Sequence, residues 1–339
     1  MKRKVALTIG ASVVVVLLGI ALGSVWLPPG QVLSILGHRM FGLPLPDHVP
    51  DTAVAILWNL RLPRALLAFL AGAALSVSGA VMQAVLRNPL ASSYTLGVSA
   101  GASLGACLVL IYGVVLPLVG ALTLPIVGFL FGVGTMLLAV VFAARLDRQM
   151  ESHTIILVGV VFTLFVGAVT TLLAALERES LQRLIFWQMG SFSGQGFEAI
   201  WILLPVIVIG TLWILRLHRE LDMMTFGESQ AMTMGVDLKR VKWTLLILAA
   251  AVTGSTISFV GVIGFVDLVV PHIVRRIFGA SHRLVIPMAV VLGGAFMVVA
   301  DLVARTVVPH TELPVGVVTA LIGAPFFVLI YRQGRAKSC

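Results

Sequence analysis

The amino-acid sequence predicts an all-α polytopic membrane protein, with about ten transmembrane helices in a single domain over residues 1–339. Of the 339 residues, 59% are hydrophobic and only 11% are charged, and the mean hydropathy is +1.09. Soluble globular domains carry about 25% charged residues, so this composition excludes them. Apolar stretches of about 20 residues, the length that crosses a hydrocarbon core as a helix, recur along the whole chain.

Ten apolar segments account for the expected helices. They lie near residues 5–26, 65–86, 95–112, 118–144, 154–176, 199–217, 243–260, 262–277, 284–302 and 314–331. The first follows the basic MKRK and looks like a signal peptide, but its apolar part is too long and no A-x-A cleavage site follows it. We interpret it as a retained first span, so that ten crossings return the chain to the side on which it began.

The basic residues orient this topology. If MKRK is cytoplasmic, seventeen of the 23 lysines and arginines lie inside, and only six lie outside, namely Arg39, Arg61, Arg64, Arg178, Arg183 and Arg305. This excess agrees with the positive-inside rule and predicts that both termini are cytoplasmic. The rule also explains the net charge of +9 better than nucleic-acid binding does. The two cysteines give neither a disulfide framework nor a metal-binding spacing, so we expect no metal and no cofactor.

Small residues recur every four positions in the second and third segments. They are Ala68, Gly72, Ser76, Ala80 and Ala84 in the second, and Gly97, Gly101 and Gly105 in the third. Helices in lipid associate through close van der Waals packing, which such stripes permit. We therefore expect both helices inside the bundle, with a pathway lining as the alternative interpretation.

Two further stretches depart from simple crossings. ERESLQRLIFWQMGSFSGQGFE, residues 177–198, combines charges with aromatic rings and predicts a short helix at the outer interface. GVIGFVDLVVPHIVRR, residues 261–276, contains Asp267 and Pro271 in an otherwise apolar run. Broken helices at membrane depth need protein or water around them, so we expect this one to be buried.

A polar stretch with a cytoplasmic location follows the sixth segment. In TFGESQAMTMGVDLKRVK, residues 225–242, a short helix is expected from Glu228 to Met234, ending at Gly235. Its small residues Ser229, Ala231 and Thr233 are interpreted as surface residues that could fit a groove on a partner. A solvated loop helix is the alternative.

Several long motifs resemble the FecCD family, the permease subunits of ABC importers for iron-siderophore complexes, haem and cobalamin. In chain order they are RLPR at 61, SVSGAVMQAVLRNPLASSYTLGVSAGASLGA at 76, FWQMGSFSG at 186, GESQAMTMGVDLKR at 227, GVIGFVDLVVPHIVRRIFGASHR at 261, ADLVART at 300 and ELPVGVVTALIGAPFF at 312. The resemblance implies a bundle like the cobalamin permease, in a bacterial or archaeal cytoplasmic (inner) membrane. It also implies a second permease subunit, in a homodimer or a pseudo-symmetric heterodimer, together with two cytoplasmic ABC ATPase subunits, an extracytoplasmic substrate-binding protein and a metal-chelate substrate.

The energy source separates this hypothesis from others. None of the five lysines follows a glycine, so the chain lacks the phosphate-binding loop G-x-x-x-x-G-K-[ST] and is not expected to be an enzyme. ATP hydrolysis would then occur on a partner subunit. The alternative is an ion-coupled secondary transporter, which needs ionisable groups at membrane depth. Asp267, His272 and Asp301 are the candidates, and Arg305 could neutralise Asp301 as an i,i+4 pair. A third class, a membrane anchor for an enzyme complex, would more often show paired histidines or a larger soluble portion.

The resemblance also assigns roles to positions of this chain. It implies binding-protein docking at Arg61, Arg64 and Arg305, and a gate at Ser152 and His153. It implies ATPase coupling through Gly227, Glu228, Ser229, Gln230, Ala231, Met232, Thr233, Met234 and Gly235. Asp267 departs from the glycine usual in the family, and we expect it to pair with His272 or Arg275 or to reach water.

Overall fold

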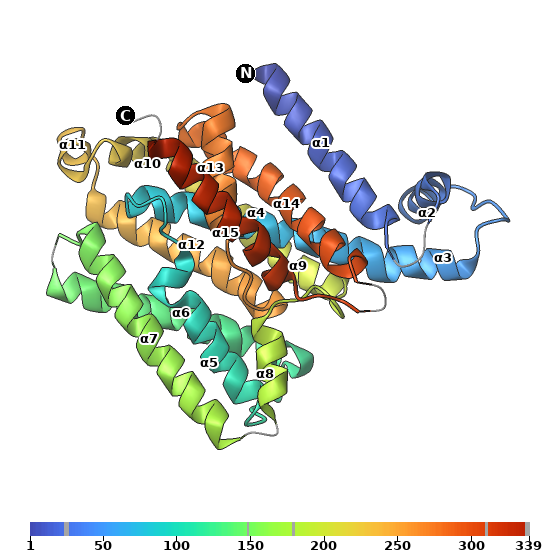
Figure 1. The fold of residues 1–339 in the computed structure, drawn as a ribbon, viewed down its shortest axis with the longest axis horizontal. Coiled ribbons are helices and arrows are strands. Elements are labelled where there is room, and N and C mark those ends of the chain that lie inside the picture. Colours follow the sequence, from blue (N-terminus) through green and yellow to red (C-terminus); the bar gives the residue numbers. More distant parts are fainter. Residues whose placement is uncertain (24–26, 148, 178–179, 309–310, 336–339) are drawn as a thin grey trace.

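In the computed structural model, the regular secondary structure of the described residues is entirely helical (Figure 1). The structure describes residues 1–23, 27–147, 149–177, 180–308 and 311–335, and in the last helix it describes side chains up to residue 326. The α-helices are α1 (Lys2–Ala21), α2 (Pro29–Phe41), α3 (Asp51–Ala55), α4 (Leu62–Val85), α5 (Val98–Leu110), α6 (Thr123–Leu146), α7 (Ser152–Leu176), α8 (Leu181–Gln188), α9 (Phe197–Arg216), α10 (His218–Thr225), α11 (Glu228–Thr233), α12 (Leu238–Val260), α13 (Val266–Phe278), α14 (His282–Thr306) and α15 (Val315–Arg335). Each of the ten expected segments corresponds to one helix. The short helices expected within 177–198 and at 228–234 are α8 and α11.

The helix α4 runs through the centre of the bundle and packs against α9, α12, α13 and α14. A Cβ placed on Gly72 would lie 2.0 Å from the carbonyl oxygen of Gly293 on α14, and one on Gly79 would lie 1.9 Å from that of Asp267 on α13. Backbones come this close only where at least one of the two residues has no side chain. The small-residue stripe of α4 is buried as predicted, and Gly101 and Gly105 of α5 pack in the same way against α6.

Seven of the described helical stretches are long and apolar enough to cross a membrane, which makes this a multi-pass membrane protein. The helices α5 and α13 have 13 residues each, which is too short for a helix to cross a membrane by itself. Before α5 the chain turns back into the bundle, since Ser93 Oγ lies 2.5 Å from Ser78 Oγ in the middle of α4. Before α13 it does the same, with the carbonyl of Ile263 accepting a hydrogen bond from Tyr94 Oη at 2.5 Å. Protein groups thus satisfy the freed backbone, as expected for a buried break.

The break in the 261–276 stretch lies before Asp267 rather than at Pro271. The helix α12 ends at Val260 and α13 begins at Val266, after Phe265 with a φ of 69°. Pro271 stands inside α13, which continues through it. The prediction of a broken and buried helix is confirmed, but the irregular residues are 261–265.

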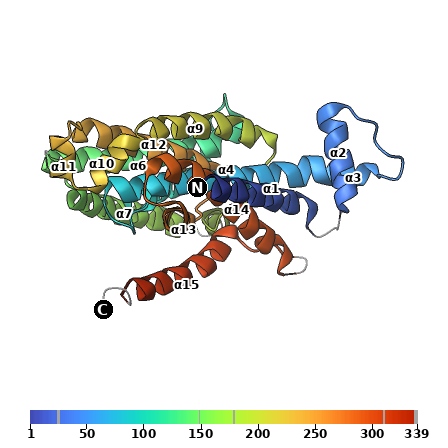
Figure 2. The ribbon, with the colours of Figure 1, turned by 90° about the horizontal axis from the view of Figure 1, so that it is seen from above.

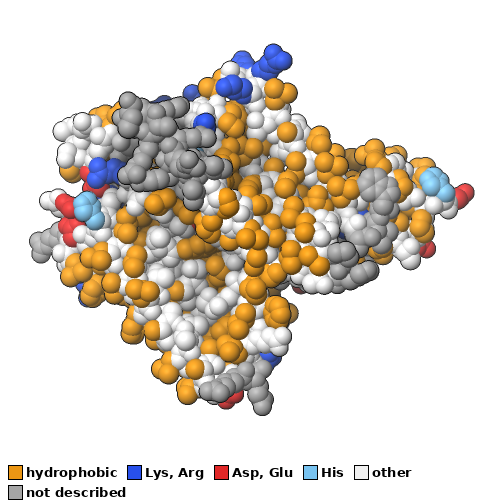
Figure 3. Space-filling model, viewed as in Figure 1, with side chains coloured by type: hydrophobic (Ala, Val, Ile, Leu, Met, Phe, Trp, Pro, Cys, Tyr) orange, Lys and Arg blue, Asp and Glu red, His pale blue; other side chains and the backbone are white. Residues whose placement is uncertain are grey.

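A second, smaller core lies where α4 begins. The helices α2 and α3 project from the bundle here (Figures 1 and 2). Their apolar side chains pack with the end of α1 and the start of α4, through Ile20, Leu27, Val32, Ile35, Val54, Leu57 and Leu62. At the opposite margin α15 diverges from the other helices (Figure 2). Much of the surface is apolar, with charged side chains gathered mainly toward its margins (Figure 3).

Candidate functional site at the two ends of α4

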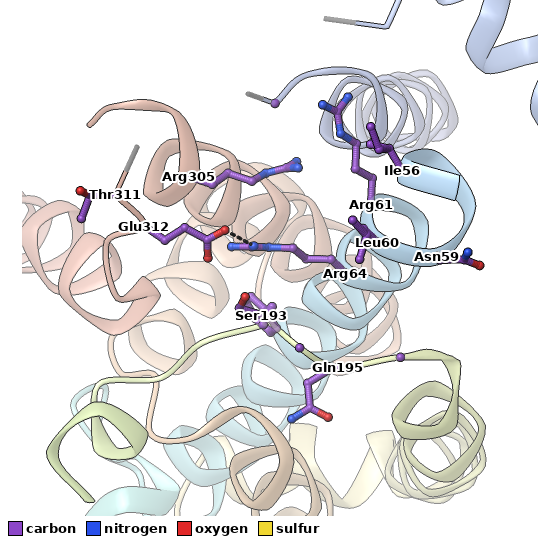
Figure 4. A pocket seen from close by; sticks show the side chains of 14 residues that line it. Ile56, Asn59, Leu60, Arg61, Arg64, Ser193, Gln195, Arg305, Thr311 and Glu312 are labelled. Atoms are coloured by element: carbon purple, nitrogen blue, oxygen red, sulfur yellow. Dashed lines mark hydrogen bonds and ion pairs between the residues drawn. The ribbon is translucent and has the colours of Figure 1, made fainter. Parts of the chain in front are cut away.

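The expected docking arginines come together at the beginning of α4, which we call the Arg61 end (Figure 4). Arg61 closes the π-helical turn Ile56–Arg61, Arg64 lies in the first turn of α4, and Arg305 lies in the last turn of α14. Because α4 and α14 are antiparallel neighbours, the start of one lies beside the end of the other. All three line a pocket of ≈ 680 Å³, together with Asn59, Ser193, Gln195 and Glu312.

Two carboxylates bind these arginines. Asp301 accepts hydrogen bonds from Arg64 Nε at 2.9 and 3.2 Å, and its Oδ1 lies 2.9 Å from Arg64 Nη2. The predicted i,i+4 pair is confirmed, with Arg305 Nε 3.4 Å from Asp301 Oδ2. On its other side, Arg64 Nη1 donates to Glu312 at 2.8 Å. The Asp301 side chain is 1% exposed, whereas that of Glu312 is 49% exposed.

The arginines also hold the end of α1 against the bundle. Arg61 donates to the carbonyl of Ala21 at 2.8 Å, and Arg305 donates to that of Gly19. The exposed fractions are 6% for Arg61, and 11% and 8% for the Arg64 and Arg305 side chains. Each of them therefore has an internal structural role that the charge pattern did not reveal. Their docking role stays a prediction.

The expected gate residues begin α7, near the other end of α4, which we call the Arg87 end. Ser152 is buried, and its hydroxyl lies 3.4 Å from the carbonyl of Val85 on α4. His153 is exposed. The loop before them is held by Asp147, whose carboxylate accepts hydrogen bonds from the backbone N–H groups of Glu151 at 2.7 Å and Gln149 at 2.9 Å. These donors favour the ionised form and lower the pKa of the Asp147 carboxyl.

The expected coupling segment is the helix α11 between two glycines. Gly227 has a φ of 120° and Gly235 a φ of 87°, which side-chain-bearing residues rarely adopt. Ala231 is fully buried, so the prediction that it is a surface residue is wrong. With six residues in the helix, one face must turn inward, and that face carries Ala231 and the half-buried Glu228. The outward face carries Ser229, Gln230, Met232, Thr233 and Met234.

Glu228 binds several elements at once. Its carboxylate lies 2.9 Å from Lys242 Nζ on α12 and 3.3 Å from Arg87 Nη2 after α4, and it accepts a hydrogen bond from Ser152 Oγ at 3.1 Å. Lys242 is fully buried and donates to the carbonyl of Met150 at 2.6 Å. The sequence offered little signal for this cluster, because Lys242 follows Lys239 and Arg240 in a basic run that the positive-inside rule already explains.

The intramembrane polar residues have partners other than those expected. Asp267 accepts a hydrogen bond from the Ser92 hydroxyl, so the prediction of His272 or Arg275 is wrong. Arg275 instead donates to the side chain of Gln83 and to the carbonyl of Ala80. The ring of His272 packs edge-on against Phe326, with centroids 6.5 Å apart. Spacing along one helix suggested the wrong partners because the true one comes from a distant segment.

A third feature is a hollow of ≈ 560 Å³ between α5, α7 and α8. Small and hydroxyl residues line it, including Ser99, Ser103, Thr163, Gly167, Thr170 and Thr171. The three threonines donate to carbonyls one turn earlier in their own helix, at 2.8 to 2.9 Å. The hydroxyl protons of these three threonines are thus already used within α7, while Ser99, Ser103 and Gln188 add further polar groups to the lining. Over the described residues, no cluster of three or more His, Cys, Asp or Glu side chains is placed to hold a metal ion.

Comparisons with known proteins agree over nearly the whole chain. A family profile described as the FecCD transport family matches residues 11–333. The chain is 41% identical over 340 residues to the uncharacterized ABC transporter permease protein YvrB of Bacillus subtilis, covering 98% of this chain and 96% of that one. It is 37% identical over 338 residues to the cobalamin import system permease protein BtuC of Halobacterium salinarum, covering 99% and 88%. A solved structure described as an inward-facing, metal-chelate type ABC transporter superposes with a TM-score of 0.83 at 27% identity, covering 97% of this chain and 99% of that one.

Proposed function

The chain belongs to the FecCD transport family and is a permease of the ABC transporter type, and we propose that it forms the membrane pathway of a binding-protein-dependent importer for a metal chelate. The observation that carries the proposal is the match along the length of both sequences, which covers 98 and 99% of this chain and 96 and 88% of the two relatives. The cytoplasmic membrane of a bacterium or archaeon is the proposed location, with the Arg87 end in the cytoplasm.

We propose that two ABC ATPase subunits bind at the Arg87 end, because the outward face of α11 offers small polar side chains beside apolar ones. Phe226, Met232 and Met234 are 70%, 56% and 49% exposed there. Large apolar side chains this exposed at a polar end of a membrane protein are typical of a protein interface. The outward face of the segment Gly227 to Gly235 would contact the ATPase, with Ser152 and His153 as the gate behind it.

At the Arg61 end we propose that a substrate-binding protein docks over the arginine pocket. Arginine suits this contact because its planar group holds a carboxylate with two hydrogen bonds and stays charged. Three arginines face two carboxylates here, so the cluster keeps a net positive charge for acidic residues of a partner. Glu312, half exposed, is the internal carboxylate that such residues would compete with.

The substrate proposed for the first test is cobalamin, since the Halobacterium relative imports it, with haem and ferric siderophores as the other family substrates. We propose that the hollow between α5, α7 and α8 lines the pathway once a second copy of the chain is present. The apolar side chains that α15 leaves exposed, such as Leu321 at 71%, suit the contact with that copy. A large chelate would move along such a surface because the surface fits the shape of the chelate and does not bind it strongly.

The ion-coupled alternative finds little support in the polar groups at membrane depth. Asp301 is bound by Arg64 and Arg305, and Asp267 by Ser92. Coupling carriers instead need an ionisable group that exchanges its ion with water. The arrangement therefore favours a passive pathway whose energy comes from the partner ATPase.

The test is reconstitution of the permease with its ATPase and its binding protein. We expect the ATPase to copurify with the permease, and ATP hydrolysis to rise when the binding protein carries cyanocobalamin, haem or a ferric siderophore. A permease that purifies without an ATPase contradicts the proposal. Copurification with no stimulation by any of the three ligands would contradict the substrate class only.

A further inference from the structure

The Glu228 cluster connects the coupling segment to the gate. Glu228 is the first residue of α11, and Ser152 is the first residue of α7. One carboxylate oxygen accepts the Ser152 hydroxyl at 3.1 Å, and the other lies 2.9 Å from Lys242 Nζ. Lys242 in turn donates to the carbonyl of Met150, two residues before Ser152. Two separate paths thus run from α11 to the loop that begins α7.

We propose that Glu228 is the positioning residue that transmits movement of α11 to the gate loop, residues 149–152, through Lys242 and Ser152. This inference rests on the proposed function, because it takes α11 as the part that the ATPase moves. It assigns Glu228 to the interior of the permease, whereas the outward residues of α11 contact the ATPase.

The burial of Lys242 makes the connection stiff. An ammonium group with no exposed surface is costly to leave without a counter-charge, so Lys242 and Glu228 must stay together or change partners together. Arg87, whose side chain is 40% exposed, also contacts Glu228 but can turn to water at little cost. When α11 moves, we therefore expect Lys242 to keep its contact with Glu228 and Arg87 to lose its contact and turn to water.

The gate loop has a conformation that depends on this support. Met150 has a φ of 53°, which residues with a side chain adopt rarely and at an energetic cost. Lys242 Nζ holds its carbonyl at 2.6 Å, and the side chain of Met150 is fully buried. Withdrawal of Lys242 removes the hydrogen bond that stabilises this backbone. Without this hydrogen bond the strained backbone at Met150 is less stable, so the loop is expected to change conformation when α11 moves.

The experiment measures gate movement directly in the reconstituted permease–ATPase complex. His153 is exposed, so His153→Cys, in a background with Cys107→Ser and Cys339→Ser, reports the loop through its labelling rate with a membrane-impermeant maleimide. Labelling is compared without nucleotide and with ATP plus vanadate. The test variant is Glu228→Gln, which keeps the shape of the side chain but removes the charge. The matched control is Glu220→Gln on α10, since Glu220 has no ion pair with any described residue.

We expect the parent and Glu220→Gln to show the same ATP-dependent change in labelling rate. In Glu228→Gln that change should shrink by about tenfold while ATPase copurification and hydrolysis persist. A full ATP-dependent change in Glu228→Gln would overturn the inference, and so would a parent whose labelling ignores ATP. If Glu228→Gln does not assemble, the double variant Ser152→Ala with Lys242→Met removes both paths, and an undiminished response there would also overturn it. A parent that fails to bind ATPase contradicts the proposed function instead.

Discussion

The two ends of α4 both hold carboxylates among cations, but the clusters connect different kinds of structure. At the Arg61 end, Asp301 joins α4 to α14, two long helices whose backbones touch at Gly72 and Gly293. At the Arg87 end, Glu228 joins the six-residue helix α11 to a loop, to the start of α12 and to the residue after α4. The first cluster therefore fixes elements that already pack closely, and the second connects elements that share few other contacts.

The difference suggests that similar ion pairs have different roles in one chain, one in stability and the other in coupling. Breaking the cluster at the Arg61 end should reduce stability, because it joins two long helices that pack closely along their length. Breaking the cluster at the Arg87 end should reduce coupling more than stability, because it joins a six-residue helix to a loop rather than two closely packed helices. The predictions below separate these two effects.

Asp301→Ala should have the largest effect. It leaves Arg64 and Arg305 buried without their shared carboxylate, and removal of one partner from a buried pair costs about 3–5 kcal/mol. The midpoint of thermal unfolding in detergent should fall clearly below that of the wild type. Glu312→Ala is the matched control, because it removes the half-exposed partner of Arg64 and should cost no more than about 1 kcal/mol. Equal losses in the two variants would contradict an anchoring role for Asp301.

The same geometry changes how docking should be tested. Arg64→Glu would place a carboxylate against Asp301 and Glu312, so it should destabilise the bundle instead of acting only on docking. A variant of Glu312 gives a cleaner test.

Lys242→Met should affect the cluster at the Arg87 end next most strongly. It keeps the length of the side chain, but it removes the link between Glu228 and the Met150 carbonyl. We expect the ATP-dependent change in labelling at position 153 to fall by about tenfold, with a smaller loss of thermal stability than Asp301→Ala shows. Arg87→Met, which removes the exposed cation, should leave both quantities close to wild type. If Lys242→Met lost as much thermal stability as Asp301→Ala and kept the full labelling response, both clusters would serve stability alone, which would contradict the proposed difference between them.

Glu312→Gln should have a modest and favourable effect, on the affinity for the substrate-binding protein. Removing the carboxylate that competes for Arg64 should tighten binding of the substrate-binding protein by up to about fivefold at low salt. The gain should shrink at about 1 M salt, where exposed charges are screened. Affinity can be measured by surface-immobilised permease in nanodiscs. Weaker binding by Glu312→Gln would show that Glu312 assists docking directly.

Asp267→Asn should have the smallest effect. Asparagine has nearly the same volume and can still accept the hydrogen bond from Ser92. ATP-dependent transport should therefore persist in this variant, and also in Asp267→Gly, which restores the residue usual in the family. Lost transport in Asp267→Asn, with an intact complex, would show that the ionised carboxylate itself is required.

Much of the fold could be predicted from the sequence, because hydropathy fixes where helices lie. It could not show that α5 and α13 cross only part of the bundle, since a short buried helix and a short span have the same composition. The helices α2 and α3 were missed because they are short and flanked by prolines at 28, 29, 44, 46 and 50. The order of the spans was enough to predict that Arg61, Arg64 and Arg305 lie on the same side of the membrane. The partners of Asp267 and Glu228 could not be predicted from the sequence, because they come from segments that only the folded chain brings together. Among the charged positions, Arg148, Arg178, Glu179 and Lys337 lie outside the described residues.

The central claim is that ATP on a partner subunit, rather than an ion gradient, drives substrate through this chain. The most direct measurement is uptake of radiolabelled cyanocobalamin, with haem and a ferric siderophore in parallel, into proteoliposomes that hold permease, ATPase and binding protein. We predict uptake of one of these ligands that requires ATP and is unchanged by proton and sodium ionophores. Uptake that proceeds without ATP and collapses with either ionophore would contradict the account.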